Sequence, residues 1–149
     1  MNNFKLFIET NKDKLNTYAK NYIEKLEIPE ILKESISYSL VNDGKKIRPL
    51  SFLYLLKYYG IDYSNYFDIA LAIELVHTYS LVHDDLPEMD DDDYRWGKLT
   101  NHKVFGQDVA VLTGDAMLTL AFEVLSDADI NPELKVRLIK QFANYSGAM

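Results

Sequence analysis

The sequence has no cysteine among its 149 residues and is short of basic charge. Without cysteine, disulfide frameworks and thiolate metal sites are excluded. The 16 lysines and arginines are outnumbered by 23 aspartates and glutamates, which gives a formal net charge of −7. Because nucleic-acid affinity depends on neutralising phosphates with basic side chains, we expect no nucleic-acid partner.

Long hydrophobic runs are also missing. No stretch of about 18 consecutive apolar residues occurs, and the N-terminal segment MNNFKLFIETNKDK lacks the apolar run of a secretory signal. We therefore expect no membrane span and a soluble, cytoplasmic protein. Hydrophobic residues still make up 48% of the chain, which is enough for a packed core, so disorder is not expected.

Apolar residues recur at helical spacing along almost the whole chain. The pattern predicts six helices, over about residues 4–26, 31–41, 49–59, 65–83, 108–125 and 132–148. No segment alternates between apolar and polar residues as a strand would, so we predict an all-α fold. Residues 1–149 contain no repeat or linker, which indicates a single helical domain. The last helical pattern is still running at Met149, and we expect a truncated chain.

The excess of negative charge lies in one segment, DDLPEMDDDD at residues 84–93. Seven of its ten residues are acidic and none is basic. The preceding helix is apolar nearly all the way round, which is typical of a buried central helix. Carboxylates at the C-terminal end of a helix are disfavoured by a few tenths to about 1 kcal/mol each. Acids that break this local rule indicate a functional site.

Pro87 ends or bends the helix after His83, which allows Asp84 and Asp90 to converge although a continuous helix would separate them. Clustered aspartates are hard oxygen ligands, suited to Mg²⁺ or Mn²⁺. An EF-hand calcium loop is excluded because Arg95 stands where that loop requires glycine. Two other interpretations stay open, a solvated acidic loop and a helical module that binds divalent cations structurally.

Basic residues gather at a second place, where Lys45, Lys46 and Arg48 follow Gly44 just before a predicted helix. A helix N-terminus with free amides and nearby cations is suited to an anion. Arg95 directly follows the acidic segment, where it forms either a local ion pair or a clamp on an anion that bound metals also contact.

His77 lies two turns before Asp84 on the same helix face, about 10.5 Å away at 1.5 Å per residue. The chain thus combines a carboxylate cluster, two cationic sites and a buried apolar helix. That combination suits an anionic substrate with an apolar tail, whose phosphate or diphosphate would lie on the metals.

The stretch LVHTYSLVHDDLPEMDDDDYRWGKLTNHKVFG closely resembles the first aspartate-rich region of the trans-prenyltransferases, the polyprenyl diphosphate synthase family. The segment DGKKIRP resembles that family's upstream Gly-Lys-x-x-Arg-Pro motif, and the order and spacing agree over roughly residues 35–126. The four-residue gap between Asp85 and Asp90 is similar to that of bacterial short-chain members, typically farnesyl or geranylgeranyl diphosphate synthases. The resemblance implies the N-terminal half of an isoprenoid-synthase-like helical bundle.

The resemblance also implies a reaction. An allylic diphosphate, dimethylallyl or geranyl, would ionise with the help of Mg²⁺, and isopentenyl diphosphate would attack the carbocation head to tail. Preorganised cations would stabilise the charge that develops on the leaving group. The implied catalytic residues are Asp84, Asp85, Asp90 and Arg95, of which the three aspartates bind or adjoin the metal and Arg95 holds the allylic diphosphate.

By the same resemblance, isopentenyl diphosphate would be held by Gly44, Lys45, Arg48 and His77. Tyr79 occupies the position where an aromatic side chain floors the cavity and limits product length, which favours a C15 over a C20 product. An ordinary core aromatic would explain Tyr79 equally well.

Two departures from the family pattern carry consequences. Trp96 stands where a second arginine usually contacts isopentenyl diphosphate; a lost charged hydrogen bond of about 1.5 to 3 kcal/mol would weaken binding roughly ten- to 150-fold. The family's second aspartate-rich motif is absent. We therefore expect this chain alone to have little or no prenyltransferase activity and to act as part of a longer or split enzyme. It would form a homodimer, or pair with a C-terminal half or a full-length subunit. A decayed fragment or non-catalytic partner subunit is the alternative.

Overall fold

The computed structural model describes residues 3–42 and 44–147, and most of them are helical. The six longest helices are α1 (Asn3–Glu24), α2 (Glu30–Leu40), α3 (Ile47–Tyr58), α4 (Phe67–Asp84), α6 (Gln107–Asp127) and α7 (Pro132–Ser146). They confirm the six predicted helices and the all-α class. The structure adds a short 3-10 turn η1 (Tyr63–Tyr66), a short helix α5 (Asn101–Phe105) and a hairpin of two-residue strands, β1 (Tyr94–Arg95) and β2 (Lys98–Leu99). These elements are too short to give a periodic signal.

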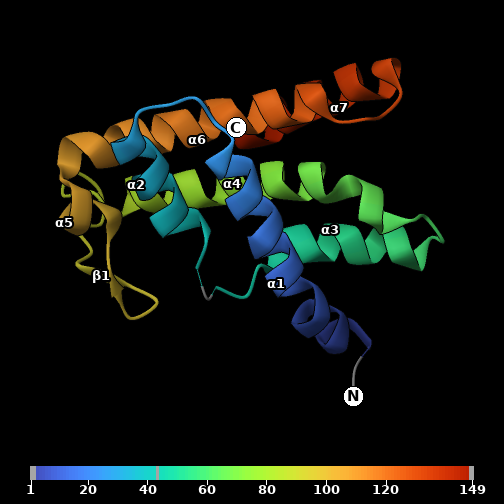
Figure 1. Cartoon of the computed structure of the whole chain (residues 1–149), viewed down its shortest axis with the longest axis horizontal. Helices are drawn as coiled ribbons and strands as arrows, with labels where there is room; N and C mark the ends of the chain where they lie inside the picture. The colour runs from blue at the N-terminus through green and yellow to red at the C-terminus, as the bar shows by residue number, and fades with distance from the viewer. Residues whose placement is uncertain (1–2, 43, 148–149) are drawn as a thin grey trace.

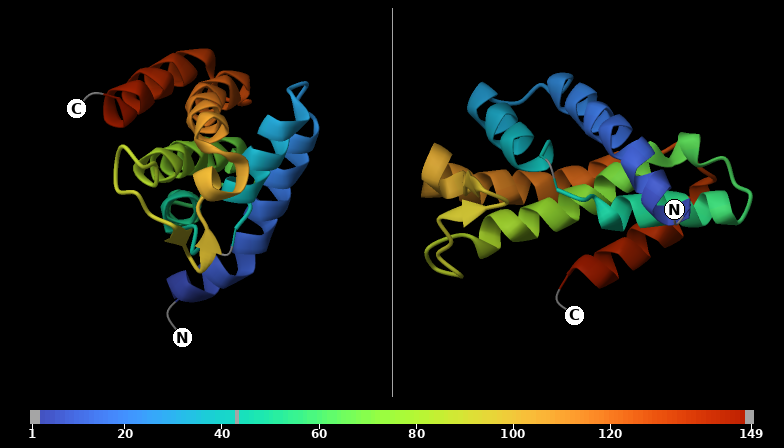
Figure 2. Two further views of the ribbon diagram at one scale, coloured as in Figure 1. Left: turned by 90° about the vertical axis from the view of Figure 1, so that its left-hand side faces the viewer. Right: turned by 90° about the horizontal axis from the view of Figure 1, so that it is seen from below.

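Helix α4 lies at the centre of the molecule (Figure 1). It packs along α6 and also contacts α1, α2 and α3. Figure 2 shows α1 and α2 on one side of the α4–α6 pair and α7 on the other. The buried residues of α4 are Ile69, Ala70, Leu71, Ala72, Glu74, Leu75, Thr78 and Val82. Burial around most of its circumference confirms the prediction of a central helix.

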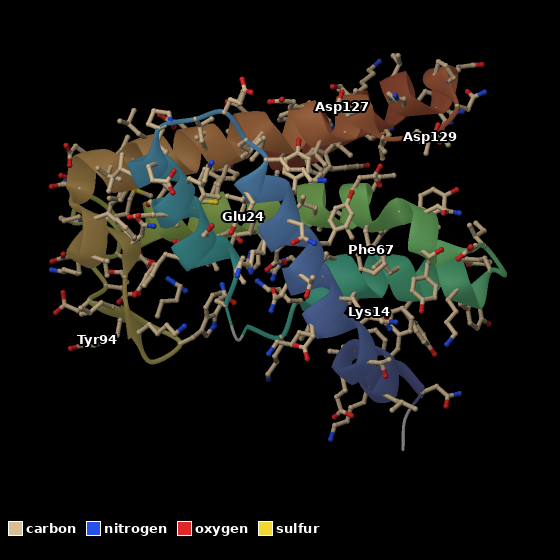
Figure 3. All side chains as sticks on the ribbon, viewed as in Figure 1. Lys14, Glu24, Phe67, Tyr94, Asp127 and Asp129 are labelled. Carbon is tan, nitrogen blue, oxygen red and sulfur yellow. The ribbon has the colours of Figure 1, made fainter. Side chains whose placement is uncertain are left out.

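The core is built from stripes of apolar side chains that face α4. In α1 the buried positions recur every four residues, which is the spacing of one helix face; they are Phe7, Asn11, Leu15, Ala19 and Ile23. Side chains fill the space between neighbouring helices, whereas Tyr94 on the hairpin lies at the periphery (Figure 3). Each fully buried Leu or Ile contributes about 1.5 to 3 kcal/mol, so the framework around α4 is held by apolar burial.

Helix α6 is the one helix in residues 3–42 and 44–147 that is long and apolar enough, by length and composition, to cross a membrane. Helix α6 contains no unbroken apolar run of that length in the sequence, because acids such as Asp115 interrupt the apolar residues. In the 18-residue stretch of α6 that meets this criterion, 44% of the residues are buried. The helix also packs along α4. We interpret α6 as a core helix, because a helix buried between others needs the same composition.

Prolines mark the helix boundaries much as the sequence indicates. Pro29 caps α2, and α3 begins at Ile47, which places Pro49 in its first turn. Pro87 follows the end of α4 by three residues. The last helix, predicted to run to residue 148, ends at Ser146; Ala148 and Met149 lie outside the described residues.

Candidate functional site

The acidic segment begins where α4 ends and the chain turns back. The N–H of Asp85 still donates to the Leu81 carbonyl at 3.1 Å, and the N–H of Asp90 donates to the Asp84 carbonyl at 2.8 Å. The turn through Pro87 therefore brings the backbone of Asp90 next to the helix end. The prediction that proline ends the helix is confirmed, and the backbones of the two aspartates are adjacent.

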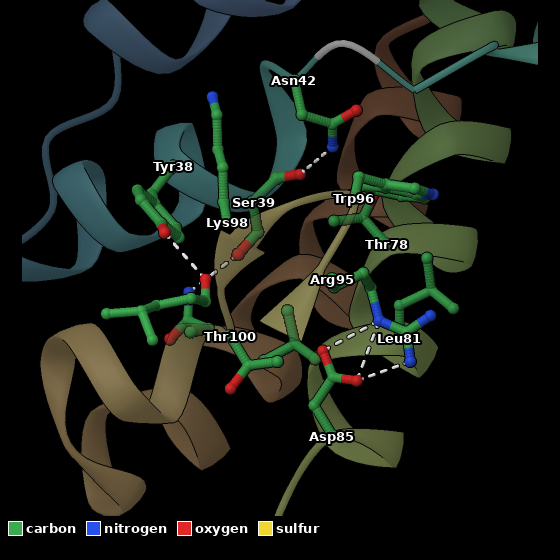
Figure 4. A pocket seen from close by; sticks show the side chains of 13 residues that line it. Tyr38, Ser39, Asn42, Thr78, Leu81, Asp85, Arg95, Trp96, Lys98 and Thr100 are labelled. Atoms are coloured by element: carbon green, nitrogen blue, oxygen red, sulfur yellow. Dashed lines mark hydrogen bonds and ion pairs between the residues drawn. The ribbon is translucent and has the colours of Figure 1, made fainter. Parts of the chain in front are cut away.

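Asp85 points inward and is only 3% exposed. Arg95 Nε lies 2.8 and 2.9 Å from its two carboxylate oxygens, and Arg95 Nη2 makes a further short hydrogen bond to Oδ1 (Figure 4). Asp92 adds a longer contact, 3.6 Å from Nη2. Hydrogen bonding to Asp85 raises the pKa of Arg95 above its ordinary value. Of the two interpretations of Arg95, the local ion pair is formed in the structure.

The hairpin that carries Arg95 is closed by Trp96 and Gly97. Both have positive φ, 50° and 79°, as the favoured two-residue hairpin turn requires. Beyond the hairpin, the buried hydroxyl of Thr100 donates to the Asp92 carbonyl at 2.8 Å, and its N–H donates to the Asp93 carbonyl at 3.0 Å. These hydrogen bonds tie the end of the acidic segment to the start of α5.

The loop between α2 and α3 approaches the hairpin from the other side. The N–H of Gly44 donates to Asn42 Oδ1 at 2.8 Å. A Cβ on Gly44 would lie 2.6 Å from that oxygen and 3.6 Å from the Trp96 ring. A side chain at this position would therefore force the loop to shift. The sequence suggested no contact between Gly44 and Trp96, because more than 50 residues separate them.

The two neighbouring lysines of this loop have different surroundings. Lys45 is exposed, whereas Lys46 is 4% exposed and turned inward. Its ammonium lies 2.9 Å from a carboxylate oxygen of Glu74. The sequence grouped Lys46 with the cations available to an anion; the structure instead pairs it with a buried acid. The signal that could have indicated this pair is Glu74 itself, the only acid between residues 69 and 83 of an apolar helix.

Arg48 meets His77 across the gap between α3 and α4. Nη1 of Arg48 donates to Nε2 of His77 at 3.1 Å, which requires an unprotonated Nε2 because arginine is only a donor. Burial and the charge of Arg48 lower the pKa of His77. The imidazole is therefore neutral near pH 7 and holds the guanidinium at the start of α3.

A cavity of ≈ 640 Å³ lies between this loop, α4 and the hairpin. Gly44, Lys45, Arg48, His77 and Arg95 all line it. The structure thus gathers every residue that the sequence assigned to diphosphate binding around one space, although they come from separate segments.

Tyr79 faces a neighbouring groove of ≈ 400 Å³, which Arg48 and His77 also line. Its hydroxyl donates to the Ser146 carbonyl at 3.5 Å. Its ring stands edge-on to His83, with ring centroids 5.9 Å apart. The side chain is therefore half-buried between α4 and the end of α7 rather than enclosed in the core.

The predicted metal ligands are not gathered in the same way. Among the described residues, no group of three or more His, Asp or Glu side chains could hold a metal ion. Asp85 is held by Arg95, while Asp84 is half-buried and Asp90 exposed. Magnesium is usually held by one or two carboxylates together with substrate phosphates. The donor chemistry of Asp84 and Asp90 fits that ion, whereas Asp85 is already occupied.

Comparison with known proteins gives consistent matches. Residues 29–148 match the family model for polyprenyl synthetases. The farnesyl diphosphate synthase of Geobacillus stearothermophilus is 46% identical over 144 residues, which cover 95% of this chain and 48% of that enzyme. A chloroplastic geranylgeranyl pyrophosphate synthase of Arabidopsis thaliana is 44% identical over 132 residues, covering 87% and 37% of the two chains.

The fold matches as well. The crystal structure of an FPP/GFPP synthase from Zymomonas mobilis superposes with a TM-score of 0.91 at 37% identity, covering 97% of this chain and 53% of that one. The chain spans between 37% and 48% of the length of the curated relatives named above, and its helices match the N-terminal half of a prenyltransferase. Because the family model covers residues 29–148, most of the sequence, the chain belongs to the polyprenyl synthetase family.

Proposed function

We propose that this chain supplies one half of the active site of a short-chain prenyl diphosphate synthase. The reaction would condense an allylic diphosphate, dimethylallyl or geranyl, with isopentenyl diphosphate. The observation that carries the proposal is the cavity where Gly44, Lys45, Arg48, His77 and Arg95 converge beside the acidic segment. The relatives described above include farnesyl and geranylgeranyl diphosphate synthases.

The Gly44–Arg48 loop is suited to the diphosphate of isopentenyl diphosphate. Lys45 and Arg48 bring two cations to the N-terminus of α3, where backbone amides and the helix dipole also favour an anion. The bond to His77 fixes one nitrogen of Arg48 and restricts the side chain before any ligand arrives. Less side-chain freedom then has to be lost when the ligand binds.

Asp84 and Asp90 would hold Mg²⁺, with Mn²⁺ as the alternative ion. The ion would neutralise the diphosphate of the allylic substrate as it leaves. Asp85 fixes the orientation of the Arg95 guanidinium, which lines the same cavity. Arg95 would thereby face the allylic diphosphate with a preset charge.

The groove beside Tyr79 would take the apolar tail. Ile73, Val76 and Phe142 line it together with Tyr79, so most of its wall is hydrocarbon. A bulky ring at Tyr79 would restrict how far a growing chain reaches, which favours a C15 product over C20.

The synthase domain represented by residues 1–149 would be completed by a C-terminal half, either within a longer enzyme or in another chain. Helix α7 has no buried residue in the described structure, and Leu134, Val136 and Tyr145 on it are 51%, 68% and 71% exposed. Such apolar exposure suits contact with a C-terminal half, a full-length subunit or a homodimer partner in the cytoplasm. The coverage of only half of each relative also allows a second candidate, a non-catalytic subunit of such a synthase.

Calorimetric titration of the purified chain with an allylic diphosphate analogue, at several magnesium concentrations, tests the site. We expect magnesium and an allylic diphosphate analogue to strengthen each other's binding, because both would share Asp84 and Asp90. Asp90→Asn should abolish this coupling, while Asp13→Asn on exposed α1 should leave it intact. Magnesium binding that is indifferent to diphosphate would instead indicate a structural cation module.

A further inference from the structure

The most enclosed charge beside the diphosphate site is the ammonium of Lys46. It is bonded to three oxygens: the Leu40 carbonyl at 2.7 Å, Glu74 Oε1 at 2.9 Å and Asn42 Oδ1 at 3.3 Å. An ammonium has three hydrogens to donate, so the protein itself satisfies all of them. Lys46 therefore has no donor left for an anion in the cavity.

These three bonds connect parts of the chain that are otherwise separate. Leu40 is the last residue of α2, Asn42 belongs to the linker, and Glu74 lies in the middle of α4. The side chains of Lys46 and Glu74 are only 1% and 6% exposed. One buried ion pair thus joins the end of α2 and the linker to the central helix.

The backbone at Lys46 shows that this arrangement is constrained. Lys46 caps α3 with φ of 50° and ψ of 35°, in the left-handed region that residues other than glycine seldom adopt. Glu74 Oε2 is buried and has no hydrogen-bond partner in the described residues. A strained cap and an incompletely satisfied buried acid persist only where the surrounding structure holds them, and such features cluster at functional sites.

The pair lies directly behind the contact that organises the cavity. Arg48 follows Lys46 by two residues, and His77 follows Glu74 by about one helical turn, where the side chains share a face. Nη1 of Arg48 and Nε2 of His77 are 3.1 Å apart. The ion pair and the Arg48–His77 contact therefore form two successive links between the same loop and the same helix.

We propose that the buried Lys46–Glu74 ion pair positions the Gly44–Arg48 loop for diphosphate, by fixing the start of α3 so that Arg48 rests on His77. Lys46 and Glu74 also line the cavity, but the Lys46 ammonium donates to protein oxygens, so we assign both as positioning residues that act through Arg48. The identity of the ligand in this inference rests on the proposed function. The link between the ion pair and the Arg48–His77 contact rests on the geometry alone.

A double variant, Lys46→Met with Glu74→Gln, tests this role. Removing both charges leaves no unpaired ion in the core, and such replacements are often tolerated. A matched control, Lys5→Met with Glu9→Gln, makes the same changes at the exposed ion pair on α1. Circular dichroism and urea unfolding would establish that both double variants are folded.

Two measurements on the folded variants decide the outcome. Titration with inorganic pyrophosphate should show at least roughly tenfold weaker binding in the Lys46/Glu74 variant, as expected when a charged contact is displaced, and unchanged binding in the control. NMR titration of His77, one of three histidines in the chain, should show its pKa rising toward the ordinary value as Arg48 leaves. Arg48, Lys46, Glu74 and Arg95 are the charged groups that act on this imidazole.

Failure of the positioning role and failure of the proposed function give different results in these measurements. If the Lys46/Glu74 variant is folded, binds pyrophosphate like the wild type and leaves the His77 titration unchanged, the positioning role is overturned. If the wild-type chain itself binds no pyrophosphate, the proposed function fails, and the His77 titration still decides whether the pair sets the Arg48–His77 contact. If the double variant unfolds, the single variant Lys46→Arg, which keeps the positive charge, replaces it in both measurements. This variant must retain the wild-type His77 titration and pyrophosphate binding, and loss of either overturns the inference.

Discussion

Trp96 is the single residue at which this chain departs most from the motif it resembles. It is 54% exposed, lines the same ≈ 640 Å³ cavity as Arg95 and lies against the position where Gly44 lacks a side chain. The ring therefore occupies space at the cavity edge without providing positive charge, and the indole N–H is its one hydrogen-bond donor. Because its φ of 50° is set by the hairpin, a replacement side chain would start from the same backbone position.

Trp96→Arg should strengthen pyrophosphate binding by roughly tenfold, since one additional charged hydrogen bond contributes about 1.5 kcal/mol. Trp96→Leu, which removes the ring without adding charge, serves as the control and should not show this gain. Calorimetric titration of both variants measures the difference. Equal affinity in the arginine and leucine variants would mean that position 96 does not face the bound anion.

At the scale of elements, the close packing of α4 against α6 sets the direction of the acidic segment. Gly114 on α6 lies under His83, the residue before Asp84; a Cβ there would be 2.1 Å from His83 Nε2. His83 Nε2 is also 3.0 Å from the Val111 carbonyl. The glycine thus makes room for an imidazole that holds the last turn of α4 on α6.

Gly114→Ala should leave the free energy of unfolding about unchanged, because the imidazole must leave its hydrogen bond at a cost of about 1 kcal/mol, which offsets the gain in helix propensity. In an unobstructed helix interior the same change would raise stability by roughly that amount. Urea unfolding of the single variants and of Gly114→Ala combined with His83→Ala forms a double-mutant cycle. Additive effects in this cycle would show that the two positions do not interact.

At the scale of the whole molecule, Lys45, Arg48 and Arg95 line one cavity, whereas residues 3–42 and 44–147 contain no group of three or more His, Asp or Glu side chains that could hold a metal ion. The chain covers 48% of the Geobacillus stearothermophilus relative and 53% of the Zymomonas mobilis structure. Asp84 and Asp90 remain as candidate ligands once Asp85 is paired with Arg95. Under the proposed function, two carboxylates would hold too little Mg²⁺ to compensate the charge of a departing diphosphate.

The purified 149-residue chain should therefore bind diphosphate but incorporate little or no radiolabelled isopentenyl diphosphate into prenyl product. Mixing it with the C-terminal half of a related synthase should raise incorporation if the missing ligands are supplied from outside. A variant with Asp84→Asn and Asp90→Asn provides the background rate for the mixture. Sustained product formation by the chain alone would contradict this prediction.

The sequence by itself determined the helices and the presence of a concentrated acidic segment. Helical periodicity and stop signals such as Pro87 are local properties, so α4 and its end could be predicted without the fold. The resemblance of the Asp-rich and Gly-Lys-x-x-Arg-Pro segments to a known family also indicated the residues that line the cavity. The short hairpin and α5 escaped prediction because two to five residues hold too little periodicity.

Only the tertiary structure decided which charges meet. Seven acids lie within ten residues, yet Asp85 alone is buried against Arg95. Lys45 and Lys46 are neighbours in sequence, but one faces solvent and the other is enclosed with Glu74. Ion pairs of this kind depend on desolvation and on distances between separate helices. Neither quantity exists until the helices have packed.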